Sequence, residues 1–278
     1  MNREIYDIAY AVQSSYQQLD VYLPDIDNNP IPVILWLHPG GFFTGDKTDM
    51  IDSLVPPALA RGYALVAANY RLTDESPFPS QIFDAKAAVR WIRANASRFN
   101  FDSNKTAAWG CSAGATLAAL LGTSAGIKEL EDLNLGNPEQ PGHVNAVVDW
   151  YGPMDFLMLN RQRIELGYKA GDNTADSMLE KLLGGPVDEY PEICNSINPA
   201  TYITTQSPPF FIQHGSKDDL VPYLQSLNLA NSLRAVLGQE KVVLSIIENA
   251  NHFSGIHQSK ENIAKALDFL DQFLKHSD

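Results

Sequence analysis

Short apolar runs alternate along the chain with longer segments of helical periodicity. Continuous apolar runs, rather than strictly alternating ones, are typical of strands that helices cover on both faces. The repeated order of strand and helix predicts an α/β fold with a mostly parallel central sheet of about eight strands and right-handed crossovers. The six clearest runs span residues 31–41, 63–69, 105–109, 143–150, 209–214 and 241–247.

Two segments near the N-terminus, residues 4–11 and 16–23, alternate apolar and polar positions more regularly. They are expected to form an antiparallel hairpin at the sheet edge. Between the strands, apolar residues recur every three or four positions, which predicts amphipathic helices. One such stripe runs from Ile82 to Phe99, in a helix that begins near Pro79 and Ser80, and the last runs from Ile263 to Leu274.

The segment of residues 151–205 interrupts this rhythm, because it holds several Gly and Pro, short helical pieces and no strong strand. We interpret it as a cap-like insertion within a single domain of residues 1–278. It is expected over the carboxyl edge of the sheet, where α/β folds bind ligands. Apolar residues considered as lining of that site, although core packing is their commoner fate, are Phe42, Phe43, Phe156, Leu157 and Met158.

Composition narrows the choice of partners. The chain has 278 residues with 20 Lys+Arg against 33 Asp+Glu, a formal net charge of −13. Such an excess of carboxylates argues against nucleic acid and against an anionic membrane surface as partners. No apolar run is long enough to span a bilayer, and the N-terminus lacks a basic region followed by an apolar stretch. We therefore expect a cytoplasmic protein, and leave a homo-oligomer open.

The sharpest local signal is the sequence from Gly110 to Gly114, which contains Cys111, Ser112 and Ala113. It falls between the strand of residues 105–109 and a helix of small residues. A nucleophile on a tight strand-to-helix turn needs very small neighbours two positions away on either side. The two glycines meet this need for Ser112 and not for Cys111. Ser112 is therefore the candidate nucleophile.

A serine hydroxyl needs a histidine base with a carboxylate behind it. His252 lies in a polar loop just after the strand of residues 241–247, where this architecture gathers catalytic groups. His257, five residues further on, is the alternative base. The remaining histidines follow or precede strands as loop-shaping residues or lie in the C-terminal tail: His38, His143, His214 and His276.

The carboxylate is expected after the strand of residues 209–214. Two adjacent residues there, Asp218 and Asp219, compete for the role, because both cannot face the histidine. The chain order of Ser112, Asp218 or Asp219, and His252 is the order of an α/β-hydrolase triad.

A fourth element, His38-Pro39-Gly40-Gly41-Phe42, follows the strand of residues 33–37. Adjacent glycines allow two backbone N–H groups to turn towards one point. With the amide of Ala113, the amides of Gly40 and Gly41 are the candidate oxyanion hole.

The chain resembles the α/β-hydrolase fold, and within it the hormone-sensitive-lipase-like esterases and the bacterial acetyl-xylan or feruloyl esterase-like carboxylesterases. The motifs that carry the resemblance are HPGGF, NYRLTDESPFPSQIFDAKAAVRWIRANA, GCSAG, WYGPMD, PPFFIQHGSKDDLVP and NANHF, in that order. The resemblance implies that the acid is Asp218, the base His252 and the nucleophile Ser112. The chain departs from the common family pattern at three places, with Pro39 in the oxyanion motif, Cys111 before the serine, and Ala115 and Thr116 after the elbow.

These features predict a serine carboxylesterase that hydrolyses short, acetyl-type acyl esters through an acyl-enzyme, without metal or organic cofactor. The substrate is a small-molecule ester, and an acylated carbohydrate is implied by the resemblance alone. The alternatives are an amidase or peptidase, arylformamidase-like, on the same triad, and a non-catalytic binding protein that kept the fold.

Overall fold

The computed structural model describes residues 3–25, 29–171 and 177–275. Within them, eight strands form one sheet in the order β1-β2-β4-β3-β5-β6-β7-β8. β1 and β2 pair antiparallel at one edge, β2 pairs antiparallel with β4, and the remaining neighbours are parallel. The strands are β1 (Arg3–Ala9), β2 (Gln18–Leu23), β3 (Ile31–Leu37), β4 (Ala64–Ala68), β5 (Phe101–Cys111), β6 (Ala146–Trp150), β7 (Phe210–Gly215) and β8 (Val242–Ile247).

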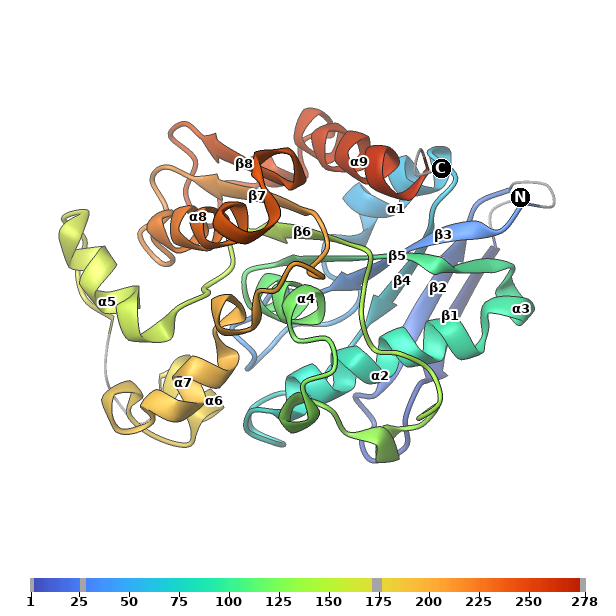
Figure 1. The fold of residues 1–278 in the computed structure, drawn as a ribbon, viewed down its shortest axis with the longest axis horizontal. Coiled ribbons are helices and arrows are strands. Elements are labelled where there is room, and N and C mark those ends of the chain that lie inside the picture. Colours follow the sequence, from blue (N-terminus) through green and yellow to red (C-terminus); the bar gives the residue numbers. More distant parts are fainter. Residues whose placement is uncertain (1–2, 26–28, 172–176, 276–278) are drawn as a thin grey trace.

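Helices cover both faces of the sheet (Figure 1). Two pack on one face, α1 (Ile51–Ala60) and α9 (Lys260–Leu274), in a core cluster with the tryptophans of β3, β5 and β6. The other face carries α2 (Ser80–Ala94), α4 (Ala113–Thr123) and α8 (Leu224–Leu237), in the larger core cluster. The expected helices on both faces and edge hairpin are confirmed, and the chain has the α/β-hydrolase fold.

The apolar stripe from Ile82 to Phe99 belongs to two helices rather than one. α2 ends at Ala94, and the short α3 (Ala96–Phe99) follows. Asn95 separates them, and both its backbone N–H and its side-chain amide donate to the carbonyl of Trp91 at 3.0 Å. A side chain that competes in this way for a carbonyl of the preceding turn favours a helix end.

The segment of residues 151–205 contributes no strand within its described part and holds α5 (Phe156–Glu165), α6 (Met178–Leu183) and α7 (Pro191–Ile197). These helices project to the left of α4 in Figure 1. The segment is tied to α8, because the side-chain oxygen of Gln225 accepts hydrogen bonds from the N–H groups of Met154 and Asp155, at 2.8 and 2.6 Å.

A buried carboxyl group on β6 makes the stability of the fold depend on pH. Asp149 is fully buried, and although Oδ1 accepts the N–H of Gly152 at 3.0 Å, Oδ2 has no partner. Burial raises the pKa of Asp149 from 3.8 to about 7. The folded state therefore holds this proton more tightly than the unfolded chain. The resulting stabilisation is complete below about pH 4 and is lost as the pH rises to about 7.

Replacing Asp149 with asparagine should remove this dependence, because the amide stays neutral. The variant should therefore gain stability relative to the parent as the pH rises: its free energy of unfolding minus that of the parent should increase from pH 4 to pH 8, by about 4 kcal/mol at most. Urea unfolding of both proteins at the two pH values, followed by tryptophan fluorescence, measures this difference. A difference that stays constant with pH would show that Asp149 is ionised in the fold.

Candidate active site

Ser112 occupies the turn between β5 and α4, in a backbone conformation (φ 51°, ψ −122°) that a residue other than glycine rarely adopts. The two flanking glycines make this turn possible. A Cβ on Gly110 would lie 2.2 Å from the carbonyl oxygen of Gly114, and one on Gly114 would lie 2.1 Å from that of Leu37. No side chain fits at either position, so the strained turn that exposes Ser112 requires both glycines.

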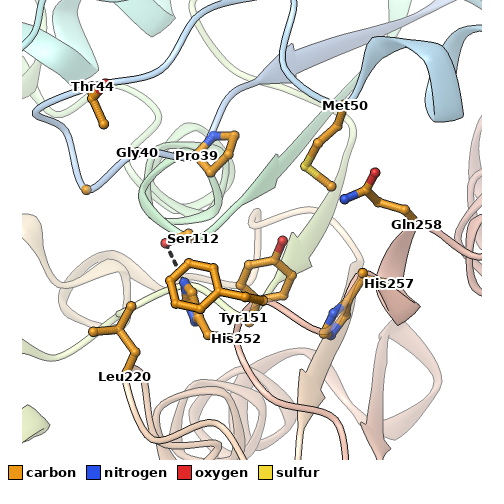
Figure 2. Close-up of a pocket in the computed structure, with 13 residues that line it drawn as sticks. Pro39, Gly40, Thr44, Met50, Ser112, Tyr151, Leu220, His252, His257 and Gln258 are labelled. Atoms are coloured by element: carbon orange, nitrogen blue, oxygen red, sulfur yellow. Dashed lines mark hydrogen bonds between the residues drawn. The ribbon is translucent and has the colours of Figure 1, made fainter.

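Ser112, His252 and Asp218 form one chain of hydrogen bonds. The Nε2 atom of His252 lies 3.1 Å from the hydroxyl oxygen of Ser112, as Figure 2 shows. Its Nδ1 atom lies 2.7 Å from Oδ2 of Asp218. The three residues come from the ends of β5, β7 and β8, which parallel pairing brings to the same edge of the sheet.

Asp218 is held as a carboxylate by its surroundings. Its Oδ1 accepts the backbone N–H groups of Leu220 and Val221 at 3.0 and 2.8 Å, and its Oδ2 lies 3.3 Å from Nε2 of His214. Burial opposes ionisation, but the hydrogen bonds from His214 and His252 outweigh it and hold the pKa of Asp218 well below its usual range. Asp219 is exposed. Of the two carboxylates, Asp218 is therefore the one that is hydrogen-bonded to His252.

His214 is buried beneath the loop that carries Asp218. Its Nε2 atom lies 2.7 Å from the carbonyl oxygen of Val221, and its Nδ1 atom 2.7 Å from the hydroxyl of Ser226 on α8. Since a carbonyl only accepts, the proton sits on Nε2 and the serine hydroxyl donates to Nδ1. His214 thus fixes the loop to α8, which agrees with the loop-shaping role expected for it.

The loop after β3 brings glycine amides to the same cleft. Gly40 and Gly41 have positive φ values of 123° and 61°, and the carbonyl of Gly40 accepts the N–H groups of Phe43 and Thr44, both at 3.0 Å. A Cβ on Gly40 would lie 1.9 Å from the carbonyl oxygen of Thr44, so this turn admits no side chain. The third candidate donor, Ala113, begins α4, where first-turn amides have no acceptor within the helix.

His38 supports this loop from below. Its Nδ1 atom lies 2.6 Å from the carbonyl oxygen of Pro39, and its ring stacks on Tyr70 at a centroid distance of 4.2 Å. The Tyr70 hydroxyl donates in turn to the carbonyl of His38 at 2.8 Å. Pro39, the departure from the family's oxyanion motif, is therefore accommodated by an ordered loop.

Tyr151 is a residue of the site that the sequence analysis missed. It follows β6 with a φ of 48°, and its ring lies 4.8 Å from the ring of His252 and 4.4 Å from that of His257, measured between centroids. Its hydroxyl is hydrogen-bonded to the thiol of Cys111. The signal available in the sequence was its position directly after an apolar strand, at the sheet edge where Ser112, Asp218 and His252 lie.

The two rivals considered for the catalytic roles lie apart from the hydrogen-bonded chain. Cys111 is fully buried, its Sγ lies 3.4 Å from Sδ of Met50, and burial raises the pKa of its thiol to about 12. Burial lowers the pKa of His257 to about 3, so its ring is neutral, and Tyr151 stands between it and Ser112 in Figure 2. His252 alone of the two histidines is hydrogen-bonded to Ser112. His276 lies outside the described residues.

A cleft of about 450 Å³ opens onto Ser112. Of the five residues considered as lining, none borders it. Phe42 and Phe156 are buried against each other instead, with ring centroids 6.4 Å apart. From the described part of the 151–205 segment, Tyr151 alone contributes, and the segment's role as a cap stays a prediction. The lining residues are Pro39, Gly40, Gly41, Thr44, Met50, Ser112, Tyr151, Leu220, His252, Phe253, Gly255, His257 and Gln258.

The 151–205 segment nevertheless acts on the cleft indirectly. The guanidinium of Arg163, on α5, donates through Nε to the carbonyl of Leu220 at 2.9 Å. Leu220 lines the cleft, and its own N–H donates to Asp218. The segment therefore supports the loop that carries Asp218.

The described residues provide neither a metal-binding cluster nor a membrane-spanning helix. In residues 3–25, 29–171 and 177–275, no cluster of three or more His, Cys, Asp or Glu is arranged to hold a metal ion. Across the same ranges, no helix has the length and apolar character needed to cross a membrane.

Comparison with known proteins places the chain in a family. Residues 19–233 match the family model described as BD-FAE. Esterase LipC of Mycobacterium tuberculosis is 30% identical over 222 residues, which make up 79% of this chain and 53% of LipC. The chain thus spans about half the length of the curated relatives that it matches over most of its own length.

Two solved structures share the architecture closely. A bifunctional GH43-CE protein of Bacteroides eggerthii is 29% identical with a TM-score of 0.89, over 98% of this chain and 35% of that one. A truncated form of a carbohydrate esterase from gut microbiota is 27% identical with a TM-score of 0.88, over 97% of this chain and 95% of that one. The resemblance to α/β-hydrolase esterases is confirmed, and the chain belongs to the BD-FAE family.

Proposed function

We propose that the protein is a serine carboxylesterase that hydrolyses short-chain acyl esters through Ser112, His252 and Asp218. The observation that carries this proposal is the chain of hydrogen bonds from Ser112 through His252 to the buried carboxylate of Asp218, open to a cleft. The esterase names of its relatives support the reaction class.

In the first half of the reaction, the Ser112 oxygen attacks the ester carbonyl while His252 Nε2 takes the hydroxyl proton. The new C–O bond makes a tetrahedral oxyanion, which the amides of Gly40, Gly41 and Ala113 would stabilise. When this intermediate collapses, the bond to the alcohol oxygen breaks, and His252 gives its proton to that oxygen. Asp218 stabilises the imidazolium that forms in between.

In the second half, His252 removes a proton from a water molecule that attacks the acyl-enzyme. The bond to Ser112 breaks, the proton returns to the serine oxygen, and the carboxylic acid leaves. One ester and one water thus give one alcohol and one acid, with no redox change. These steps use only side chains and amides of this chain.

We further propose that the enzyme prefers short acyl groups and that the alcohol of its substrate is a carbohydrate. Thr44 and Leu220 stand on one side of Ser112 in Figure 2 and bound the cleft there. Phe253, beside His252 at the cleft, is 83% exposed and offers an apolar face at the entrance. The neighbour described as a carbohydrate esterase supports a sugar as the alcohol.

Hydrolysis of p-nitrophenyl esters from acetate to decanoate tests this function. We expect kcat/KM to be highest for acetate or butyrate and to fall by about a hundredfold towards decanoate. The reason is that longer acyl chains would not fit on the side of the cleft that Thr44 and Leu220 bound. Fastest cleavage of decanoate would contradict the short-chain preference. Cleavage of acetanilides without any ester hydrolysis would show that the triad serves an amidase.

A further inference from the structure

One arginine of the 151–205 segment is buried against the loop that carries Asp218. Arg163 lies on α5 and is 8% exposed. Its Nε atom donates to the carbonyl oxygen of Leu220 at 2.9 Å, and its Nη2 atom donates to the same oxygen. Its Nη1 atom donates to the side-chain oxygen of Asn160 at 3.1 Å. All three nitrogens of the guanidinium are engaged, so this buried cation is held in one orientation.

The surroundings of this guanidinium are fixed to the rest of the fold. Gln162, the residue before Arg163, accepts a hydrogen bond from Nε2 of Gln225 on α8 at 2.6 Å. The chain returns to the same place after α5, where the N–H of Gly171 donates to Oδ1 of Asn160 at 2.9 Å. A Cβ on Gly171 would lie 2.1 Å from Nη1 of Arg163, so the guanidinium packs directly against the backbone.

The carbonyl that Arg163 contacts belongs to the peptide unit between Leu220 and Val221. This peptide is trans, so its C=O and N–H point in opposite directions. The N–H of the same unit, that of Val221, donates to Oδ1 of Asp218 at 2.8 Å. One peptide therefore joins the guanidinium to the carboxylate, with a hydrogen bond at either end. We call this connection the peptide link.

The hydrogen bonds of the peptide link strengthen one another. A cation bonded to a carbonyl oxygen polarises the peptide, which makes its N–H a stronger donor to the carboxylate. Asp218 is 1% exposed, and charges in such a buried place are little screened by water. Burial lowers the pKa of Arg163, and the charges of Asp218 and Asp219 oppose that shift.

The direct partners of the Asp218 carboxylate are rings. Among the described residues, the ion-pair partners within 4 Å of it are His214 and His252. His214 carries one proton in the hydrogen-bonding pattern described above, and His252 must be neutral to accept the proton of Ser112. Neither ring therefore supplies a full positive charge before the reaction begins. The peptide link is the route by which a permanent cation acts on this carboxylate.

We propose that Arg163 is a positioning residue for the esterase reaction. Through the peptide link it holds the Asp218 carboxylate in the orientation that His252 requires. This inference rests on the proposed esterase function and extends it to α5. Arg163 is not among the residues that line the cleft, so the 151–205 segment would contribute to catalysis without touching the substrate.

A double-mutant cycle between Arg163→Met and Asp218→Asn tests the proposal. Methionine keeps an unbranched apolar side chain and removes the guanidinium. In the parent, Arg163→Met should lower kcat for p-nitrophenyl acetate by about thirtyfold and leave KM within about twofold. In Asp218→Asn, the same change should lower kcat by less than about twofold, because the carboxylate that Arg163 positions is gone.

Arg161→Met is the matched control, because it removes the same charge from an exposed side chain on the same helix. It should keep kcat within about twofold of the parent. Arg163→Lys restores a cation and should recover at least about threefold of the lost kcat. It also replaces Arg163→Met in the cycle if that variant does not fold. An equal loss of kcat in both backgrounds would overturn the proposal, because Arg163 would then support the fold or the cleft wall rather than Asp218.

Urea unfolding of the same four proteins at pH 7 separates the peptide link from the esterase function, since it needs no substrate. If Arg163 stabilises the carboxylate, Asp218→Asn should lose less stability in the Arg163→Met background than in the parent. Equal losses would overturn the peptide link even in an active esterase. A parent that hydrolysed no ester would contradict the esterase function, and the smaller loss would still support the action of Arg163 on Asp218.

Discussion

Replacing Ser112 with alanine should lower kcat for p-nitrophenyl acetate by at least about 10⁴-fold, because no acyl-enzyme can form without the serine oxygen. The substitution removes one oxygen and keeps the turn that Gly110 and Gly114 make possible. We therefore expect the variant to fold like the parent. Initial rates at equal folded concentration, checked by circular dichroism and thermal unfolding, measure the loss.

The matched control for this variant is the neighbouring Cys111→Ala. Its thiol is fully buried, and burial holds it in the neutral form. We expect Cys111→Ala to keep kcat within about tenfold of the parent, with the difference coming from its lost contacts with Met50 and Tyr151. Activity that survives in Ser112→Ala and disappears in Cys111→Ala would reverse the two assignments.

An organophosphonate probe gives a second readout that does not depend on turnover. Mass spectrometry of the parent should find one adduct, on the peptide that holds Ser112, and Ser112→Ala should give none. An adduct that persists in the variant would place the reactive nucleophile elsewhere in the chain.

The sequence could predict the turn that carries Ser112, because the backbone there admits only glycine on either side of it. Only glycine fits at positions 110 and 114, where a Cβ would meet a carbonyl oxygen at 2.2 and 2.1 Å. Such a requirement produces two glycines at a fixed spacing, and this pattern can be recognised in the sequence alone. The positions of the strands along the chain and the loop that holds His252 could be predicted for a similar reason, since long apolar runs mark buried strands.

The choice between Asp218 and Asp219 needed the structure. Both carboxylates have the same chemistry, and their chain positions differ by one. What separates them is the turn, in which the N–H groups of Leu220 and Val221 point at Asp218 while Asp219 remains exposed. The resemblance to known esterases gave the same answer, but the residue pattern alone did not.

The lining of the cleft was the least predictable part. Phe42 and Phe156 are apolar enough for a substrate pocket, yet they pack against each other in the core. Tyr151 borders the cleft because its ring lies between His252 and His257, which are more than a hundred residues away in the chain. Contacts of this kind depend on how separate loops meet, and no local pattern records them.

Replacing Asp218 with asparagine should lower kcat for p-nitrophenyl acetate by about 10⁴-fold, the size known for the corresponding change in a serine protease triad. The carboxylate accepts a hydrogen bond from Nδ1 of His252 at 2.7 Å and so leaves Nε2 free to take the serine proton. An amide in its place can donate to Nδ1 and favour the wrong tautomer. The expected change is in kcat, with KM nearly unaffected.

The matched control is Asp219→Asn, which changes the same charge one residue away on an exposed side chain. It should keep kcat within about twofold, since surface substitutions away from special features have small effects. A large loss in Asp219→Asn together with a small loss in Asp218→Asn would contradict the orientation of the triad described above.

Stability gives an independent check on the state of Asp218. Because its folded pKa lies below the unfolded value, its ionised form stabilises the fold at pH values above about 4, and this contribution is lost as the pH falls further. Asp218→Asn should therefore unfold more easily than the parent at pH 7, and the gap should narrow in acid. A gap that widened as the pH fell would mean that Asp218 is protonated in the folded protein, and a protonated acid could not stabilise the imidazolium on which the proposed mechanism depends.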